Sequence, residues 1–195
     1  GYVFAKRIFG IKGSYAVDPQ KGAVVMTLTT QGDVPIHYTL DGSEPTAASP
    51  RYTGPVEIGK SARFRATALR EGGENASYSR EFAFSKSTGR PAVLNTKPND
   101  SYTFEGASLL VDGYHSRPVF TSGAWLGYLD EPLDVTIDMG GEQSYRSVEL
   151  ETLAEKGDWI FPPSSVTVWV SDNGTDFTEA VSYTHLRAHE TLMNL

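Results

Sequence analysis

Hydrophobic and polar residues alternate with a period of two along most of this chain, whereas the spacing that marks an amphipathic helix is almost absent. In the stretch AVVMTLTT, Val24, Met26 and Leu28 fall on one face, and in SSVTVWV the same is true of Val166 and Val168. Such alternation is typical of half-buried β-strands. Strands of about 5 to 9 residues, separated by Gly, Pro and Asp turns, predict an all-β protein made of β-sandwiches.

The first set of strands occupies residues 13–86 and contains an unusual turn, LDGSEPTAASPRYTGP. Asp41-Gly42 follows a predicted strand, and glycine tolerates the positive φ that tight turns need. The prolines that follow cannot donate to a central ladder, so we expect a wrapped loop until Val56. Asp41 and Glu44 form a candidate carboxylate pair, which we interpret as turn-forming residues with solvated charge.

A second set of alternating stretches follows a segment rich in Ser, Thr, Pro and Asn. We interpret residues 87–101 as a linker that runs into the first strand of a second domain, residues 102–181. The stretches LDVTIDMG, RSVELETL and SSVTVWV predict strands of this domain. The sequence therefore predicts two consecutive all-β domains, with no internal repeat that relates them.

Composition narrows the classes of partner. Lys and Arg number 17 against 24 for Asp and Glu, which gives a formal charge of −7, and no long run of like charge occurs. Binding to nucleic acid or to an anionic membrane surface is therefore not expected. The chain has no cysteine, which excludes disulfides and thiol catalysis. No apolar run approaches the length of about 18 residues that a membrane span needs, so no transmembrane segment is predicted.

The first domain resembles a known family. The stretches IHYTLDGSEPTAASPRYTGPVEI and ARFRATALREG closely resemble the small Ig-like domain at the C-terminal side of chitobiase and β-N-acetylhexosaminidases. The resemblance implies an Ig-like β-sandwich over residues 13–86. Other exported bacterial carbohydrate enzymes carry the same motif, so the resemblance points to a group of enzymes more than to one enzyme.

The second domain resembles a coagulation factor 5/8 type C domain, also called a discoidin or galactose-binding-like domain. The pieces LLVDGYHSR, WLGY, LDVTIDMGG and SVTVWVSDNGTDF occur in the order of that family. The resemblance implies a jelly-roll β-sandwich, incomplete here because further strands of that family would have to follow. The two domains are ordered as in the tail of a family 20 glycoside hydrolase, so residues 1–12 are expected to be the exit segment from an upstream catalytic barrel.

The last residues break the alternation. Residues 182–195, SYTHLRAHETLMNL, resemble the translated end of a sequencing-library adapter, and we expect them to be a non-native tail. His185 and His189 have the spacing of half a zinc site on a helix, but a foreign segment would have no evolved metal site. Without its last strands the second domain is expected to be unstable by itself, whereas residues 13–86 are expected to fold alone.

One loop of the second domain offers residues suited to sugars. Sugar sites on β-sandwiches commonly stack an aromatic ring on a pyranose and bond its hydroxyls with Arg, Asn, His or Asp side chains. The resulting candidates for carbohydrate binding are Tyr114, His115, Arg117, Trp125 and Tyr128. For Trp125 the alternative is a core position, which is usual in the discoidin pattern.

Galactose-binding-like domains often hold a structural calcium ion, and calcium prefers oxygen ligands. The resemblance therefore implies a calcium site at Asp112, with a further oxygen from Ser116. The alternative is that Asp112-Gly113 only forms a turn. No cofactor is expected to be required beyond this structural ion.

No catalytic residues are predicted, because the acidic residues are scattered over turns and strand faces and no nucleophile or metalloprotease motif occurs. We interpret the chain as a non-catalytic accessory region, a spacer with a carbohydrate-binding module, of an exported bacterial glycosidase. By resemblance this enzyme is a β-N-acetylhexosaminidase acting on terminal N-acetylhexosamine, in the periplasm, outside the cell or on its outer surface. Its partners would be an upstream barrel of the same chain and a glycan. The alternative is a modular cell-surface adhesin or glycan-binding protein with no enzymatic domain.

Overall fold

The computed structural model describes residues 10–70, 75–184 and 193–194. All the strand ladders in this part of the chain are antiparallel, and its helical elements are short 3-10 turns. The predicted all-β class is therefore confirmed. Within the same residues, no helix is long and apolar enough to cross a membrane.

The chain divides into two compact units. The first unit comprises the residues up to Arg90 together with Leu110–Tyr114. The second comprises Pro91–Leu109 and the residues from His115 onward. The bounds predicted from the sequence differ from these units. The prediction placed Leu110–Tyr114 in the second domain and treated residues 87–101 as a linker, which the units divide after Arg90.

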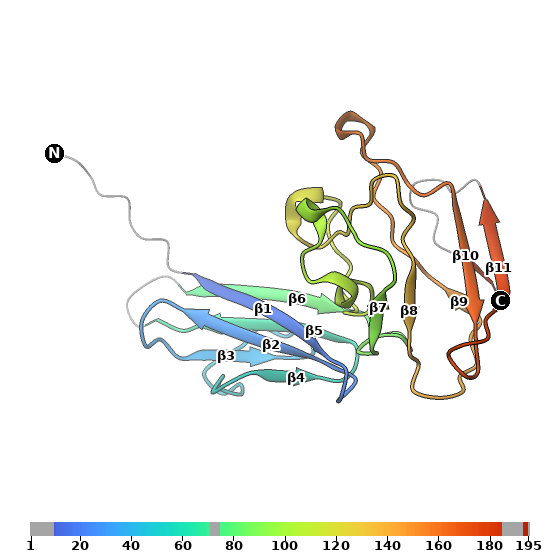
Figure 1. Ribbon diagram of the computed structural model, residues 1–195. Coiled ribbons are helices and arrows are strands. Elements are labelled where there is room, and N and C mark those ends of the chain that lie inside the picture. Colours follow the sequence, from blue (N-terminus) through green and yellow to red (C-terminus); the bar gives the residue numbers. More distant parts are fainter. Residues whose placement is uncertain (1–9, 71–74, 185–192, 195) are drawn as a thin grey trace. The chain divides into compact units, whose positions relative to one another are not determined.

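The first unit is a β-sandwich of two three-stranded antiparallel sheets (Figure 1). One sheet has the order β1-β2-β4, with bounds Ile11–Asp18, Ala23–Thr30 and Val56–Ile58. The other has the order β3-β5-β6, with bounds Ile36–Thr39, Ala62–Ala68 and Ala76–Phe82.

The core of this sandwich follows from the alternation along its strands. Val24 and Met26 of β2 have no exposed surface, and neither has Phe64 of β5. Phe82 of β6 is 1% exposed and belongs to the same core cluster. Burying side chains of this size stabilises a fold by about 1.5–3 kcal/mol each, so the inward face of each strand holds the two sheets together.

The turn after β3 forms as its sequence predicts. Gly42 has a φ of 84°, a conformation that disfavours side chains. The chain then returns beside β3, where Tyr38 N–H donates to the Pro50 carbonyl at 3.0 Å and Tyr52 N–H donates to the Ile36 carbonyl at 2.8 Å. The proline-rich loop therefore covers the outer edge of β3, which would otherwise offer unpaired backbone groups.

Residues 110–114 complete the first unit from a distant part of the chain. The Ala83 N–H donates to the Gly113 carbonyl at 2.7 Å, and the Gly89 N–H donates to the Val111 carbonyl at 2.8 Å. Val111 itself is 2% exposed. The segment thus pairs its backbone with the chain after β6 and adds an apolar side chain to the unit.

The second unit contains three two-stranded antiparallel ladders. Strand β7 (Ala92–Leu94) pairs with β8 (Val135–Ile137), and β9 (Ser147–Val148) pairs with β12 (Met193–Asn194). Strand β10 (Ser165–Val170) pairs with β11 (Thr178–Thr184). Four 3-10 turns lie between the strands: Asp100–Tyr102, Gly106–Leu110, Phe120–Ser122 and Lys156–Asp158.

The two units differ in how well they bury apolar side chains. Apart from Pro98, every buried apolar residue among those described belongs to the first unit. In the second unit large apolar side chains are exposed instead, with Trp159 at 84% and Trp169 at 54%. Trp169 lies on the face of its strand opposite Val168, which is half-buried. The described strands of this unit thus depend on ladder hydrogen bonds more than on a core.

Strand β11 extends beyond the residue at which native sequence was expected to end. It pairs Ser165 with Thr184 and Thr167 with Ser182, and the hydroxyls of the latter pair lie 3.1 Å apart. Serine and threonine hydroxyls suit a solvated ladder, so period-two burial is not required for this pairing. His185 and His189, the candidate half of a zinc site, lie outside the described residues.

The edges of the two sheets of the first unit approach closely at one glycine. A Cβ atom added at Gly13 in β1 would lie 2.3 Å from Cζ of Tyr78 in β6. We therefore expect Gly13→Ala to lower the free energy of unfolding by about 1–3 kcal/mol, because the ring or the strand must shift. The measurement is urea unfolding of the full chain, followed through the NMR amide resonances of β5.

Gly54→Ala is the matched control, because a Cβ atom there would have no heavy atom within 4 Å. Equal stabilities for the two variants would contradict the close approach of β1 and β6.

Candidate functional site

Asp112 and Tyr114, two of the predicted ligand-binding residues, belong to the first unit. Asp112 is buried, with 4% of its surface exposed. The Tyr15 hydroxyl donates a hydrogen bond of 2.8 Å to Asp112 Oδ2, and the Tyr114 backbone N–H donates one of 2.8 Å to Asp112 Oδ1. Both carboxylate oxygens therefore have a donor, as a buried carboxylate requires.

The Arg80 guanidinium lies over two aromatic rings beside this carboxylate. Its Cζ atom is 4.1 Å from the centroid of the Tyr114 ring and 4.7 Å from that of Tyr15. Both tyrosine rings also contact Phe82 edge to face. Cation–π contacts contribute about 0.5–2 kcal/mol each. We call these residues, Tyr15, Arg80, Phe82, Asp112 and Tyr114, the aromatic–carboxylate cluster.

Local sequence explains how these side chains meet. Arg80 and Phe82 are two residues apart in β6, so they project from the same face of the strand. Gly113 separates Asp112 from Tyr114 and has a φ of 67°. A Cβ atom at Gly113 would lie 2.9 Å from Thr88 Cγ2, so the tight turn needs glycine for both conformation and space.

Burial dominates the electrostatics of the cluster. It raises the pKa of the Asp112 carboxyl above its ordinary value, although the hydrogen bonds from Tyr114 and Tyr15 and the charge of Arg80 act in the opposite direction. Burial also raises the pKa of the Tyr15 hydroxyl, and the neighbouring Asp112 carboxylate raises it further. The Tyr15 hydroxyl therefore remains a hydrogen-bond donor throughout the neutral range.

In this arrangement protein groups already occupy the Asp112 carboxylate. Two donors occupy its carboxylate oxygens, and the cationic Arg80 lies close enough to lower its pKa. Ser116 lies in the second unit, where its hydroxyl is 3.2 Å from the Arg117 carbonyl. A cation at Asp112 would have to displace the Tyr15 hydroxyl, so calcium at Asp112 and Ser116 stays a prediction that calorimetry with and without a chelator can check.

The remaining sugar-binding candidates lie in the second unit. His115 Nδ1 forms a hydrogen bond with the Glu151 carboxylate, and both side chains are exposed. The Trp125 indole N–H donates to the Arg117 carbonyl at 3.2 Å, and the Trp125 side chain is half-buried. The Arg117 carbonyl thus orients the indole, and the Arg117 residue is exposed. Three of the candidates, His115, Arg117 and Trp125, lie on this segment, which we call the His115–Trp125 loop.

Tyr128 occupies a different environment. Its hydroxyl donates to the Thr96 carbonyl at 3.4 Å and is half-buried. Burial raises the pKa of this hydroxyl, and the Thr96 contact partly offsets the effect. Tyr128 therefore contacts the chain just after β7, and its hydroxyl already forms a hydrogen bond within the protein.

The candidate carboxylate pair of the first turn is not a pair in the structure. Asp41 Oδ1 accepts hydrogen bonds from the Ser43 N–H at 3.0 Å and the Ser43 hydroxyl at 2.6 Å, which lower the pKa of Asp41. Glu44 forms an ion pair with Arg65 instead. Both carboxylates thus stabilise the turn, in agreement with the interpretation as turn-forming residues.

The sequence also contains an adjacent Asp-Glu pair, Asp130-Glu131. The interpretation of the acidic residues as scattered did not take this pair into account. Both residues are exposed, and Asp130 has a φ of 62° in a turn. A glycosidase acid requires a protected site that raises its pKa. An exposed turn does not provide that environment.

The sequence patterns did not predict three residues of these sites: Tyr15, Arg80 and Glu151. Tyr15 lies 97 residues before its partner Asp112, and Glu151 lies 36 residues after His115. One sequence carries no spacing rule for pairs so far apart. The alternation within one strand, which puts Arg80 on the same face as Phe82, was the one local pattern that could have indicated Arg80.

The raised pKa of Asp112 makes a pH-dependent prediction. Because folding favours its protonated form, the stability from this group is fully present below the ordinary carboxyl pKa, about 4, and is lost as pH rises through the higher folded-state value. Asp112→Asn keeps an oxygen acceptor but cannot titrate. The unfolding free energy of the native chain minus that of Asp112→Asn should therefore fall as pH rises from acid to neutral.

Urea unfolding across this pH range checks the result, with the amide resonances of β5 as the probe because all three tryptophans lie in the second unit. A difference that is constant or that grows with pH would contradict the burial of Asp112.

Comparison with known proteins finds a family of domains that the first unit resembles. No curated protein matches the chain. Residues 13–80 match a family model described as the chitobiase/beta-hexosaminidase C-terminal domain. The match covers most of β1, all of β2 to β5 and most of β6, including the turn after β3. The sandwich of the first unit is thus similar to the C-terminal domain of chitobiases and β-hexosaminidases.

Proposed function

We propose that this chain is a non-catalytic accessory region of an exported glycosidase, a β-N-acetylhexosaminidase acting on terminal N-acetylhexosamine. The observation that carries the proposal is the match of residues 13–80 to the chitobiase/beta-hexosaminidase C-terminal domain. In this proposal the first unit is a rigid spacer beside a catalytic barrel of the same protein. The second unit adds affinity for a glycan.

The construction of the first unit supports a spacer. Its core is continuous between two sheets. Three of its exposed carboxylates, Glu44, Glu57 and Glu81, form ion pairs. Lys21 pairs with Glu57 at 2.6 Å, and Arg63 pairs with Glu81 at 3.1 Å. These carboxylates have structural partners on open strand faces, and a spacer requires no more than a stable shape.

The His115–Trp125 loop supports glycan binding by the second unit. His115 and Glu151 supply a paired donor and acceptor at the surface, and Arg117 supplies exposed N–H donors. The Trp125 ring is held in place through its N–H group, which leaves part of its apolar face accessible. Ring stacking with hydrogen bonds to hydroxyls is the chemistry that a pyranose offers.

Arg117→Ala tests the glycan-binding part of the proposal. The full chain is titrated with N,N′-diacetylchitobiose, and binding is followed by isothermal calorimetry. We expect Arg117→Ala to weaken binding by about tenfold, because one charge-assisted hydrogen bond is lost. Arg146→Ala is the matched control, since Arg146 is also exposed in the second unit. Absence of binding by the native chain, or equal binding by both variants, would contradict a sugar site in the His115–Trp125 loop.

The enzymatic part of the proposal has a separate test. Recovery of the coding sequence that precedes Gly1 in its genome should reveal a repeating strand–helix pattern of a (β/α)₈ barrel with an adjacent Asp-Glu pair. Further β-sandwich modules with no such barrel would favour the cell-surface adhesin instead.

A further inference from the structure

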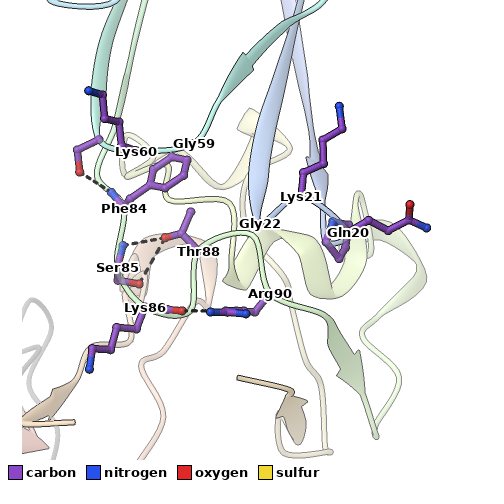
Figure 2. A pocket seen from close by; sticks show the side chains of 12 residues that line it. Gln20, Lys21, Gly22, Gly59, Lys60, Phe84, Ser85, Lys86, Thr88 and Arg90 are labelled. Carbon is purple, nitrogen blue, oxygen red and sulfur yellow. Dashed lines mark hydrogen bonds between the residues drawn. The ribbon is translucent and has the colours of Figure 1, made fainter. Parts of the chain in front are cut away.

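The first unit has an open hollow at one end of its sandwich, apart from the aromatic–carboxylate cluster. Its volume is about 610 Å³, which is within the usual range of ligand sites. Three segments form its walls: the turn from β1 to β2, the turn from β4 to β5, and the chain that follows β6 (Figure 2). All of these segments belong to the first unit.

The hollow is strongly positive in a chain that is negative as a whole. Four of its twelve lining residues are cationic, namely Lys21, Lys60, Lys86 and Arg90, and none is acidic. The chain as a whole has a formal charge of −7. A concave surface lined by one sign of charge concentrates the opposite charge in solution, so this end of the sandwich attracts anions.

Two of these cations are available to a ligand. The Lys60 side chain has no hydrogen-bond or ion-pair partner among the described residues. Arg90 uses only Nε, which donates to the Lys86 carbonyl at 3.4 Å, and its terminal nitrogens form no ion pair with a described carboxylate. Guanidinium and ammonium groups both form charge-assisted hydrogen bonds with oxyanions.

The nearby carboxylates are already occupied. Glu57 pairs with Lys21, and Asp18 Oδ1 accepts the backbone N–H groups of Gln20 and Lys21 at 3.1 and 3.3 Å. The positive charge of Lys60 and Arg90 is therefore not neutralised from within the described part of this unit.

The other walls of the hollow suit a saccharide. Phe84 lines it and is partly buried against the core. Thr88 Oγ1 accepts the Ser85 N–H at 2.9 Å, which holds the loop in shape (Figure 2). An aromatic ring with hydroxyl and cationic groups around it can stack a pyranose and bond its substituents.

We propose that this hollow binds the anionic group of a saccharide, a sulfate ester or a uronate carboxylate, with Lys60 and Arg90 as its cationic contacts. The choice of a saccharide rests on the proposed function, whereas the anion site rests on the charge and shape of the hollow. A nucleic acid or an acidic peptide would need a longer basic track than one concave end of a small sandwich supplies.

The test is an NMR titration of the full chain at low salt with four probes. They are a chondroitin 4-sulfate tetrasaccharide, a hyaluronan tetrasaccharide, chitotetraose and sodium sulfate. We expect both charged saccharides to shift amide resonances of residues 20–22, 59–61 and 84–90, and chitotetraose to leave them unchanged. Added salt should weaken this binding. Tighter binding of the sulfated probe would assign a sulfate ester, and equal binding of the two would assign the carboxylate.

Substitutions identify the contacts. Lys60→Ala combined with Arg90→Ala should weaken binding of the charged saccharide by about tenfold or more. Lys12→Ala combined with Arg146→Ala removes the same charge from exposed positions outside the hollow and should have little effect. If Arg90→Ala disturbs the loop, Lys60→Gln alone replaces the double variant. It changes a side chain that has no partner within the described residues, so a loss of saccharide binding would report on the site itself.

Three results would overturn the proposal: no shift with either charged saccharide, equal loss of binding in both double variants, or inorganic sulfate binding as tightly as the saccharide. None of these results bears on chitobiose binding at the His115–Trp125 loop or on an upstream barrel. The proposed function and the anion site can therefore fail separately.

Discussion

The docking of residues 110–114 onto the first sandwich is the interaction on which the arrangement of the other features depends. The buried Asp112 carboxylate accepts the Tyr15 hydroxyl, and Tyr114 packs on Arg80 and Phe82. Taking a carboxylate out of water costs several kcal/mol unless hydrogen bonds and an opposite charge compensate. The segment therefore has few alternative positions, because another placement would leave Asp112 without these partners.

This docking determines which residues are available for binding. Asp112 and Tyr114 are occupied within the first unit, whereas His115, Arg117 and Trp125 remain in the second. The single loop of candidates expected from the sequence is thereby divided between the units at Tyr114. The two binding proposals accordingly concern two surfaces, the His115–Trp125 loop for a neutral sugar and the basic hollow for an anionic one.

Local patterns predicted most of the first sandwich. Period-two alternation located β2, and the Asp41-Gly42 pair located the turn, because these features depend on neighbouring residues alone. The place of Asp112 escaped prediction because its partner lies 97 residues earlier. The basic hollow was not predicted for the same reason, since Lys21, Lys60 and Arg90 come from three separate segments and line one hollow only in the folded chain. In the second unit the alternation located strands but not a core, because the apolar faces of those strands remain partly exposed.

Hydrogen exchange of two backbone amides tests the docking of residues 110–114 most directly. The Ala83 and Gly89 N–H groups donate to carbonyls of this segment at 2.7 and 2.8 Å, and both lie beyond the last strand of the sandwich. The account predicts that, in the native full chain, both amides exchange as slowly as those in the central strand β5. Exchange of both at the rate of an open loop would show that residues 110–114 are not part of the first unit.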